Sequence, residues 1–233
     1  MRKLIVFAAA VVAVAGCSST GPTFQEGPDA EVTYDGLTRL DNTTMDVVWA
    51  RTDIDLTSFN KVMFERVAVD FRAIEGGPLS GRAGRGATTA SSRNRNQFRL
   101  DEATREQIVT EISTAAREEM ARSEVFEIVD EADYDVLLIR VALLDVVSRV
   151  PPEAVGRSSI WLDSVGEATL VLEVRDSMSN AIFLRAVDRR AAGDRQGGVS
   201  SNSVTNAAEV RRLGRRWASI ARAGLDTLMS EGY

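Results

Sequence analysis

The segment that most restricts the fold is Asp135–Val147, which is apolar on both of its alternating faces. A strand with this pattern has no polar face to offer to water, so it belongs in the buried middle of a sheet. A second signal comes from two segments, Gly166–Arg175 and Ile182–Arg190, with the mostly polar turn residues 176–180 between them. Clean alternation in the first segment and turn-forming residues after it predict an antiparallel hairpin.

Two further segments have the periodicity of amphipathic helices. Residues 101–122 and 206–229 both repeat apolar side chains at three- and four-residue spacing. Asn206 followed by Glu209 resembles a capping box, which places the expected start of the second helix. Each helix therefore has one apolar stripe to bury.

Two more strands complete the expected order. Val62–Phe71 alternates loosely and is rich in β-forming residues, and Phe126–Val129 is a short strand. The order is then β-α-β-β-β-β-α. We expect an α+β fold: a two-layer sandwich of a mainly antiparallel sheet with two helices on one face. The preceding segment, from Val47 to Phe59, is expected to cover one edge of the core.

The N-terminus has the parts of a secretory signal. Two basic residues precede Leu4–Ala15, an apolar run shorter than the roughly 20 residues that span a bilayer core. The motif Val14-Ala15-Gly16-Cys17 then resembles the bacterial lipobox. That resemblance implies cleavage between Gly16 and Cys17, a diacylglycerol on the cysteine sulfur, and acylation of the new amino terminus. The alternatives are an ordinary signal peptide and an uncleaved anchor.

Lipidation would attach the mature chain to a membrane. Each buried methylene contributes about 0.8 kcal/mol, so one acyl chain binds marginally and two or more hold stably. Ser18 follows the cysteine. In the lipoproteins that the motif resembles, Asp at this position retains the protein at the inner membrane, whereas Ser permits passage to the outer membrane. We therefore expect a lipid-anchored protein on the periplasmic face of the outer membrane.

These signals divide the chain into three parts. Residues 1–16 are the expected signal peptide, and residues 17–33 are the lipidated cysteine with a polar, flexible tether. Residues 34–233 form a single α+β domain. Within it, residues 72–99 are expected to be a long loop, because turn- and loop-forming residues, glycine and serine above all, are frequent there.

The same loop, which we call the arginine segment (residues 72–99), has an unusual charge. Six arginines stand against Glu75, giving +5 inside a chain whose formal charge is −6. Arginine makes bidentate contacts with oxyanions, so the segment is a candidate for contact with an anion or an acidic partner. The candidate residues are Arg82, Arg85, Arg93 and Arg95. The alternative is a solvated insertion that its charge keeps soluble.

Composition excludes several kinds of chemistry. The chain has no histidine and one cysteine, which the lipobox resemblance assigns to lipid. Ser-His-Asp and Cys-His catalysis are therefore excluded, as are zinc sites built from histidine and cysteine. An acidic chain also lacks the basic footprint that general nucleic-acid binding needs. We expect no enzyme activity, no metal, no cofactor and no nucleic-acid partner.

Charged residues interrupt the expected sheet. Arg140 falls on one face of the central strand, Asp145 falls on the other, and Glu173 lies on the alternating strand. The three could form a polar cluster, in which Asp145 and Glu173 would serve as the carboxylate pair of a hydrolase. The alternative is ion pairs at a strand end or on a solvated face.

Four blocks resemble successive blocks of one bacterial lipoprotein family: LTSFNKVMFERVAV, ADYDVLLIRVALLDVV, VGEATLVLEVRDSMSNAIFLRAVDRRA and RRWASIARAGLDTL. It is the family catalogued as domain of unknown function 3313, and the likeness runs from about Tyr34 to the C-terminus. None of the blocks is a catalytic motif. The resemblance therefore implies a fold and a family, but no activity and no catalytic residue.

A wider likeness is to the periplasmic domains of envelope accessory lipoproteins. The order of elements is similar to that of the curli-secretion lipoprotein, a penicillin-binding-protein activator and an exopolysaccharide-export lipoprotein. Those usually carry Thr-Gly-Glu after the turn aspartate, where this chain has Ser-Met-Ser-Asn-Ala at residues 177–181. They act by assembling with partners. The resemblance thus implies a membrane-anchored, non-catalytic accessory or scaffold protein, with an envelope protein partner or self-association. A periplasmic ligand- or glycan-binding module and a carboxylate-based hydrolase are the alternatives.

Overall fold

The computed structural model describes residues 21–73, 97–98, 100–150, 160–193 and 198–231. The elements in these ranges are β1 (Thr23–Phe24), β2 (Thr38–Asp41), β3 (Val47–Ala50), β4 (Lys61–Phe64), β5 (Ala68–Phe71), α1 (Glu102–Met120), β6 (Glu127–Ile128), β7 (Val136–Ser148), β8 (Ile160–Leu162), β9 (Gly166–Asp176), β10 (Ile182–Ala192), β11 (Val199–Ser201) and α2 (Ser203–Glu231). Neither of these helices combines the length and the apolar character needed to cross a membrane.

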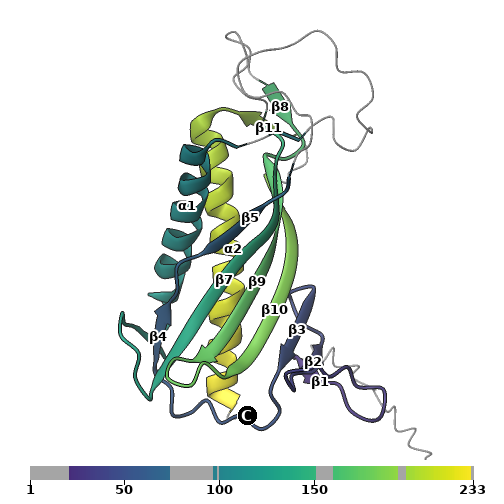
Figure 1. The fold of residues 1–233 in the computed structure, drawn as a ribbon, viewed down its shortest axis with the longest axis vertical. Coiled ribbons are helices and arrows are strands. Elements are labelled where there is room, and N and C mark those ends of the chain that lie inside the picture. The colour runs from purple at the N-terminus through teal and green to yellow at the C-terminus, as the bar shows by residue number, and fades with distance from the viewer. Residues whose placement is uncertain (1–20, 74–96, 99, 151–159, 194–197, 232–233) are drawn as a thin grey trace, which may run out of the picture.

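Nine of the strands form one sheet, and α1 and α2 pack together on one of its faces (Figure 1). The order across the sheet is β1-β2-β3-β10-β9-β7-β4-β6, and β5 also pairs with β7. The β4–β6, β4–β7 and β5–β7 pairs are parallel, and the remaining pairs of this sheet are antiparallel. β8 and β11 form a separate two-stranded sheet. The expected α+β fold, a mainly antiparallel sheet with two helices, is confirmed.

The two strongest strand signals of the sequence form the centre of the sheet. β7 pairs with β9 along nearly its whole length, and β9 pairs with β10 as the expected hairpin. Asp176 closes the turn, because its Oδ1 accepts the backbone N–H groups of Met178 (2.8 Å) and Ser179 (2.6 Å). Asn180 has a left-handed φ of 60°, which asparagine tolerates better than most residues.

The single strand expected at Val62–Phe71 is two strands, β4 and β5, which pair in succession with the same edge of β7. Phe64 is aligned with Ile139 and Ala68 with Ala142, so this segment uses four residues where β7 uses three. The extra residue acts as a bulge. In β4, before the bulge, the apolar side chains at even-numbered positions face the core. In β5, after the bulge, the apolar side chains at odd-numbered positions face it.

Both helices begin at capping side chains. Asp101 Oδ1 accepts the N–H of Thr104 (2.8 Å) at the start of α1. The prediction of a capping box at Asn206 is wrong, because the capping residues lie one turn earlier in the chain. Asn202 Oδ1 accepts the N–H of Thr205 (2.9 Å), and the N–H of Asn202 donates to Thr205 Oγ1 (3.0 Å). This reciprocal pair satisfies two backbone groups at the start of α2.

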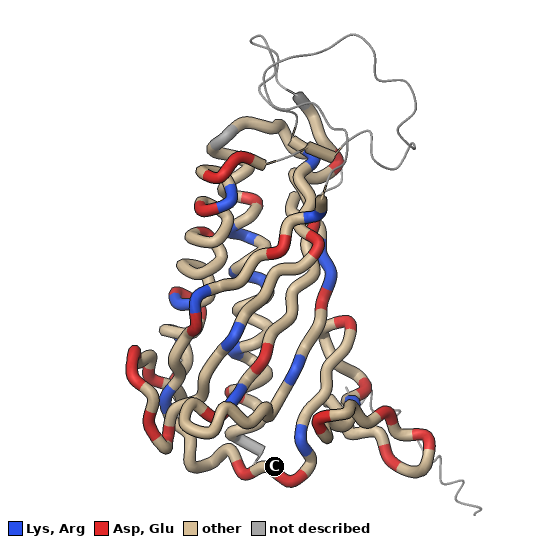
Figure 2. The backbone as a smooth tube through the Cα atoms, in the orientation of Figure 1, with Lys and Arg blue, Asp and Glu red and all other residues tan. Residues whose placement is uncertain are grey.

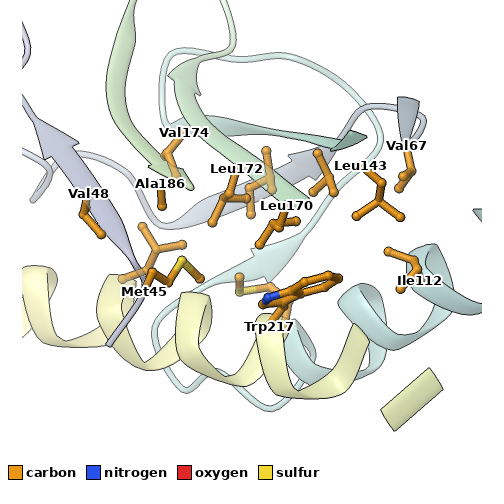
Figure 3. Close-up of a cluster of buried hydrophobic side chains, with 14 of the residues drawn as sticks. Met45, Val48, Val67, Ile112, Leu143, Leu170, Leu172, Val174, Ala186 and Trp217 are labelled. Carbon is orange, nitrogen blue, oxygen red and sulfur yellow. The ribbon is translucent and has the colours of Figure 1, made fainter. Parts of the chain in front are cut away.

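The core lies between the helices and the sheet. In Figure 3, Trp217 of α2 and Ile112 of α1 point toward Leu143 and Leu170 of the sheet, and all four side chains are buried. Gly214 lets the helices approach each other, since a Cβ there would lie 3.0 Å from Ile112 Cδ1.

One carboxylate is buried in the same layer. Asp188 of β10 is 0% exposed and accepts hydrogen bonds from Trp217 Nε1 (2.7 Å), the Asp46 N–H (3.2 Å) and the Arg190 guanidinium. A buried charge is tolerated only when it is paired and hydrogen-bonded, and Arg190 supplies the opposite charge. Asp188 therefore joins β10, α2 and the turn before β3.

Five short strands have no counterpart among the expected elements: β1, β2, β3, β8 and β11. β3 lies between β2 and β10 in the main sheet, and Leu56 and Phe59, which follow it, are buried, as expected for a segment that covers one edge of the core. Residues 21–33, which the sequence assigns to the tether, include β1, and β1 pairs with β2. The expected signal peptide and Cys17 lie outside the described residues.

Candidate functional site

The candidate site is the face of the main sheet that is turned away from the helices, which we call the open face. Figure 1 views the sheet from this side, with α2 behind the strands, and no described helix covers it. Figure 2 shows acidic and basic residues alternating along these strands. The central side chains of the open face are Arg140, Ala142 and Leu144 of β7, Glu167, Thr169, Val171, Glu173 and Arg175 of β9, and Arg185, Val187 and Arg189 of β10.

An apolar row crosses the middle of the open face at right angles to the strands. Strand pairing aligns Ala68 with Ala142, Ala142 with Val171, Val171 with Val187, and Val187 with Val47. All five side chains remain at least partly accessible to solvent. These residues come from five strands, so the row exists only through the register between them.

A first charged network lies on one side of the apolar row. Glu173 accepts hydrogen bonds from Arg175 Nη2 (2.7 Å) and Arg185 Nε (3.0 Å). Arg185 Nη2 extends the network to Asp35 Oδ2 (2.8 Å), in the turn before β2. The Glu173 and Arg185 side chains are only 13% and 18% exposed although no helix covers them. These charges are therefore largely neutralised within the molecule.

A second network lies on the other side of the row, around a bulge in β7. Asp145 has a left-handed φ of 55°, at the position where the register between β7 and β9 shifts. Its carboxylate accepts hydrogen bonds from Arg72 and from Arg189 Nη1 (3.0 Å). Arg189 Nη2 also donates to Glu167 (2.9 Å), which in turn pairs with Arg149 (3.3 Å).

The structure corrects the expected placement of three charged residues. In a regular strand Asp145 would lie on the face opposite Arg140, but the bulge lets its carboxylate bond to Arg189 on the same open face as Arg140. The three residues do not form one cluster. Arg140 is aligned with Glu173 across the strands, yet it donates to Glu65, and Asp145 belongs to the second network.

The pKa values of the two carboxylates are shifted in the same direction. Hydrogen bonds from neighbouring arginines, Arg72 foremost, lower the pKa of Asp145 to about 2. Burial raises the pKa of Glu173, but hydrogen bonds from Arg175 and Arg185 outweigh it, and the pKa is lowered. A general acid must keep its proton near neutral pH, which requires a raised pKa. Neither carboxylate therefore has the raised pKa that the general acid of a hydrolase needs.

The remaining expected site residues lie outside the described part of the chain. They are Gly16 and Cys17 of the lipobox and Arg82, Arg85, Arg93 and Arg95 of the arginine segment. The described start of that segment, Arg72, is bound to Asp145. Among the described residues, no group of three or more His, Cys, Asp or Glu side chains could hold a metal ion.

Solved structures with some likeness to the chain are distant. The PelC dodecamer from Paraburkholderia phytofirmans has a TM-score of 0.35 at 11% identity, over 75% of this chain and 96% of that one. Protein XCC0632 from Xanthomonas campestris has a TM-score of 0.36 at 8% identity, over 85% of this chain and 96% of that one. The hypothetical protein CT253 from Chlamydia trachomatis has a TM-score of 0.34 at 8% identity, over 74% and 99%. Such scores establish neither a shared fold nor a shared role.

No curated protein matches the chain. One family model does, over residues 29–220, which is well over half of the chain. The match includes β2 to β11, the open face and most of α2. It confirms the family resemblance carried by the four sequence blocks. The chain belongs to the family described as protein of unknown function (DUF3313).

Proposed function

We propose that the protein is a membrane-anchored, non-catalytic accessory protein of the bacterial envelope, and that it acts by binding another envelope protein through the open face. The observation that carries this proposal is the apolar row between two ion-paired networks. An apolar centre with a polar, arginine-rich surround is the usual anatomy of a protein–protein interface.

Charge complementarity favours a protein surface as the occupant. The ion pairs of the open face and its margins join six arginines (72, 140, 149, 175, 185 and 189) to five carboxylates (35, 65, 145, 167 and 173). Such a face is nearly neutral, whereas binding a polyanion needs a strongly basic one. A partner with an apolar strip and charges of both signs would fit it.

The lipid anchor is proposed from the lipobox motif. The few residues between Cys17 and the described domain would make the connection to the membrane short. Gly21, the first described residue, follows Cys17 by four residues, so their Cα atoms are at most about 14 Å apart. A lipid on Cys17 would therefore hold this domain close to the membrane surface. That position suits a protein whose partner lies in the same envelope.

The test is crosslinked co-purification from the native envelope. We expect Val171→Arg and Val187→Arg to remove the crosslinked partner, because a charge would interrupt the apolar row. Gln107→Arg, at an exposed position of α1, is the matched control and should retain it. Cys17→Ala should move the protein from the membrane fraction to the soluble fraction. Partners that persist in both valine variants, or a Cys17→Ala protein that still sediments with membranes, would contradict the proposal.

A further inference from the structure

The open face has the size of a protein–protein interface. In a sheet each residue occupies about 16 Å², because strands lie about 4.8 Å apart and rise about 3.3 Å per residue. β7, β9 and β10 have 11 to 13 residues each, and β5 and β3 add four residues each on either side of them. These five strands therefore present about 700 Å². Two such faces in contact would bury about 1,400 Å², within the roughly 1,200–2,000 Å² that stable complexes bury.

The charges at one level of the open face alternate in sign from strand to strand. Strand pairing aligns Arg140 of β7 with Glu173 of β9, and Glu173 with Arg185 of β10. On the other side of β7, Glu65 lies beside Arg140 and accepts a hydrogen bond from its guanidinium. Read across the sheet, the order of charges is negative, positive, negative, positive. The same order read backwards has the opposite sign at every position.

The level on the other side of the apolar row has the same property. Asp70 of β5 and Arg189 of β10 stand at its two ends, and the uncharged Leu144 and Thr169 lie between them. The apolar row has it as well, because its residues on β5 and β7 are alanines and those on β9 and β10 are valines. Reversing the order of the strands therefore sets negative charge against positive charge and small side chains against larger ones.

We propose that the occupant of the open face is a second copy of this chain, related to the first by a two-fold axis that runs parallel to the strands, midway between β7 and β9. Rotation about this axis places β7 opposite β9 of the partner copy, and β4 and β5 opposite its β10. Such an interface is isologous, so every contact occurs twice. Sheets that pack face to face keep their strand directions within about 30° of each other, and this axis gives such an alignment. The inference rests on the proposed function, because it names the occupant of the same face.

In this dimer each charged residue of the two levels faces an opposite charge, and each alanine of the row faces a valine. The facing pairs are Arg140 with Glu173, Glu65 with Arg185, Asp70 with Arg189, Ala142 with Val171, and Ala68 with Val187.

Charge selects this axis over two others. An axis along β9 would set Glu173 against itself and Arg140 against Arg185. An axis along the apolar row would set Arg185 against Arg189, which lie on the same strand on either side of the row. Like charges that face each other across an interface disfavour that mode of binding.

The contact between Asp70 and Arg189 is the one to test. Asp70 is exposed and forms no ion pair within the described ranges, so its charge can be reversed without breaking a pair in its own copy. Arg189 is 43% exposed and pairs in its own copy with Asp145 and Glu167, so its reversal needs evidence that the variant is folded.

The experiment is sedimentation velocity of the lipidated, mature protein in detergent micelles. Protein concentrations reach about 100 μM, above the micromolar upper end of dissociation constants for interfaces of this size. The variants are Asp70→Arg and Arg189→Asp. Asp163→Arg is the control, because it makes the same change in net charge as Asp70→Arg at an exposed position outside the open face.

We expect the wild type and the control to dimerise alike. Each reversed variant alone should dimerise at least about tenfold more weakly, because the two-fold axis repeats the contact between like charges. An equimolar mixture of the two variants should regain the dimer, because both contacts between positions 70 and 189 of a mixed dimer again join opposite charges. That recovery also shows that both variants are folded.

Three results would overturn the inference: a monomeric wild type, an Asp70→Arg variant that dimerises like the wild type, or a mixture that associates no better than its components. The proposed function fails separately. A monomeric wild type whose crosslinked partner is a different protein, lost in Val171→Arg, would remove the dimer and leave the proposed function standing. A crosslinked partner that persists in Val171→Arg and Val187→Arg would contradict the proposed function itself.

Discussion

The buried carboxylate of Asp188 allows a quantitative test of how the helical layer is held to the sheet. Asp188→Ala would leave the Trp217 N–H without its acceptor and the Arg190 guanidinium, only 20% exposed, without its counter-charge. Removing one partner of a buried pair destabilises a protein by about 3–5 kcal/mol. For a domain of this size, that corresponds to a fall in Tm of roughly 6–20 °C.

Trp217→Phe isolates one part of this effect. It removes the 2.7 Å hydrogen bond and leaves Arg190 and the Asp46 N–H on Asp188, so we expect a loss of about 1.5–3 kcal/mol plus a smaller packing term. The double variant should be less destabilised than the sum of the single variants, by about 0.5–3 kcal/mol.

The assay is urea unfolding followed by far-ultraviolet circular dichroism, because tryptophan fluorescence changes with the substitution itself. Asp70→Ala, at an exposed aspartate of β5, is the control and should stay within about 0.5 kcal/mol of the wild type. A loss below about 1 kcal/mol for Asp188→Ala, or strictly additive single effects, would refute the view that this carboxylate connects α2 to β10.

Two further predictions concern the bulge and the helix cap. The pKa of Asp145 is lowered to about 2, from an ordinary value of about 3.9, so its ionised form stabilises the fold above about pH 4 and loses that effect as pH falls toward 2. Asp145→Asn should flatten this part of the curve of urea midpoint against pH, and an unchanged slope would contradict it. Asn202→Ala should lower the free energy of unfolding by about 0.5–2 kcal/mol because the α2 cap is lost, whereas Asn206→Ala, at the position the sequence suggests as the cap, should have a smaller effect in the same urea assay.

The sequence predicts the centre of the sheet because local patterns suffice there. β7, β9 and β10 are long strands, with continuous apolar character or clear alternation. The short strands β1, β2, β3, β8 and β11 have two to four residues each, and no periodicity can be read in so few positions. Their pairing partners define them, and some of those partners are distant in the chain, as β10 is from β3.

Bulges explain most of what the sequence cannot supply about the open face. A strand period of two assigns Arg140 and Asp145 to opposite faces, and one extra residue at Asp145 cancels that assignment. The bulge between β4 and β5 leaves a visible trace, since the apolar residues change from even to odd positions within Val62–Phe71. No comparable trace marks the apolar row, because it depends on the relative alignment of five strands.

The base of the arginine segment has a consequence for what the chain can accommodate. Its two anchor points on β7 are the carbonyls of Val146 and Ser148, which are neighbours on one strand. Closing a loop between such points costs only about 0.6 kcal/mol more for each doubling of its length. The arginine segment can therefore be lengthened, shortened or given a grafted epitope while the register of the sheet is preserved. This makes it a suitable place for variation in length and for a reporter sequence.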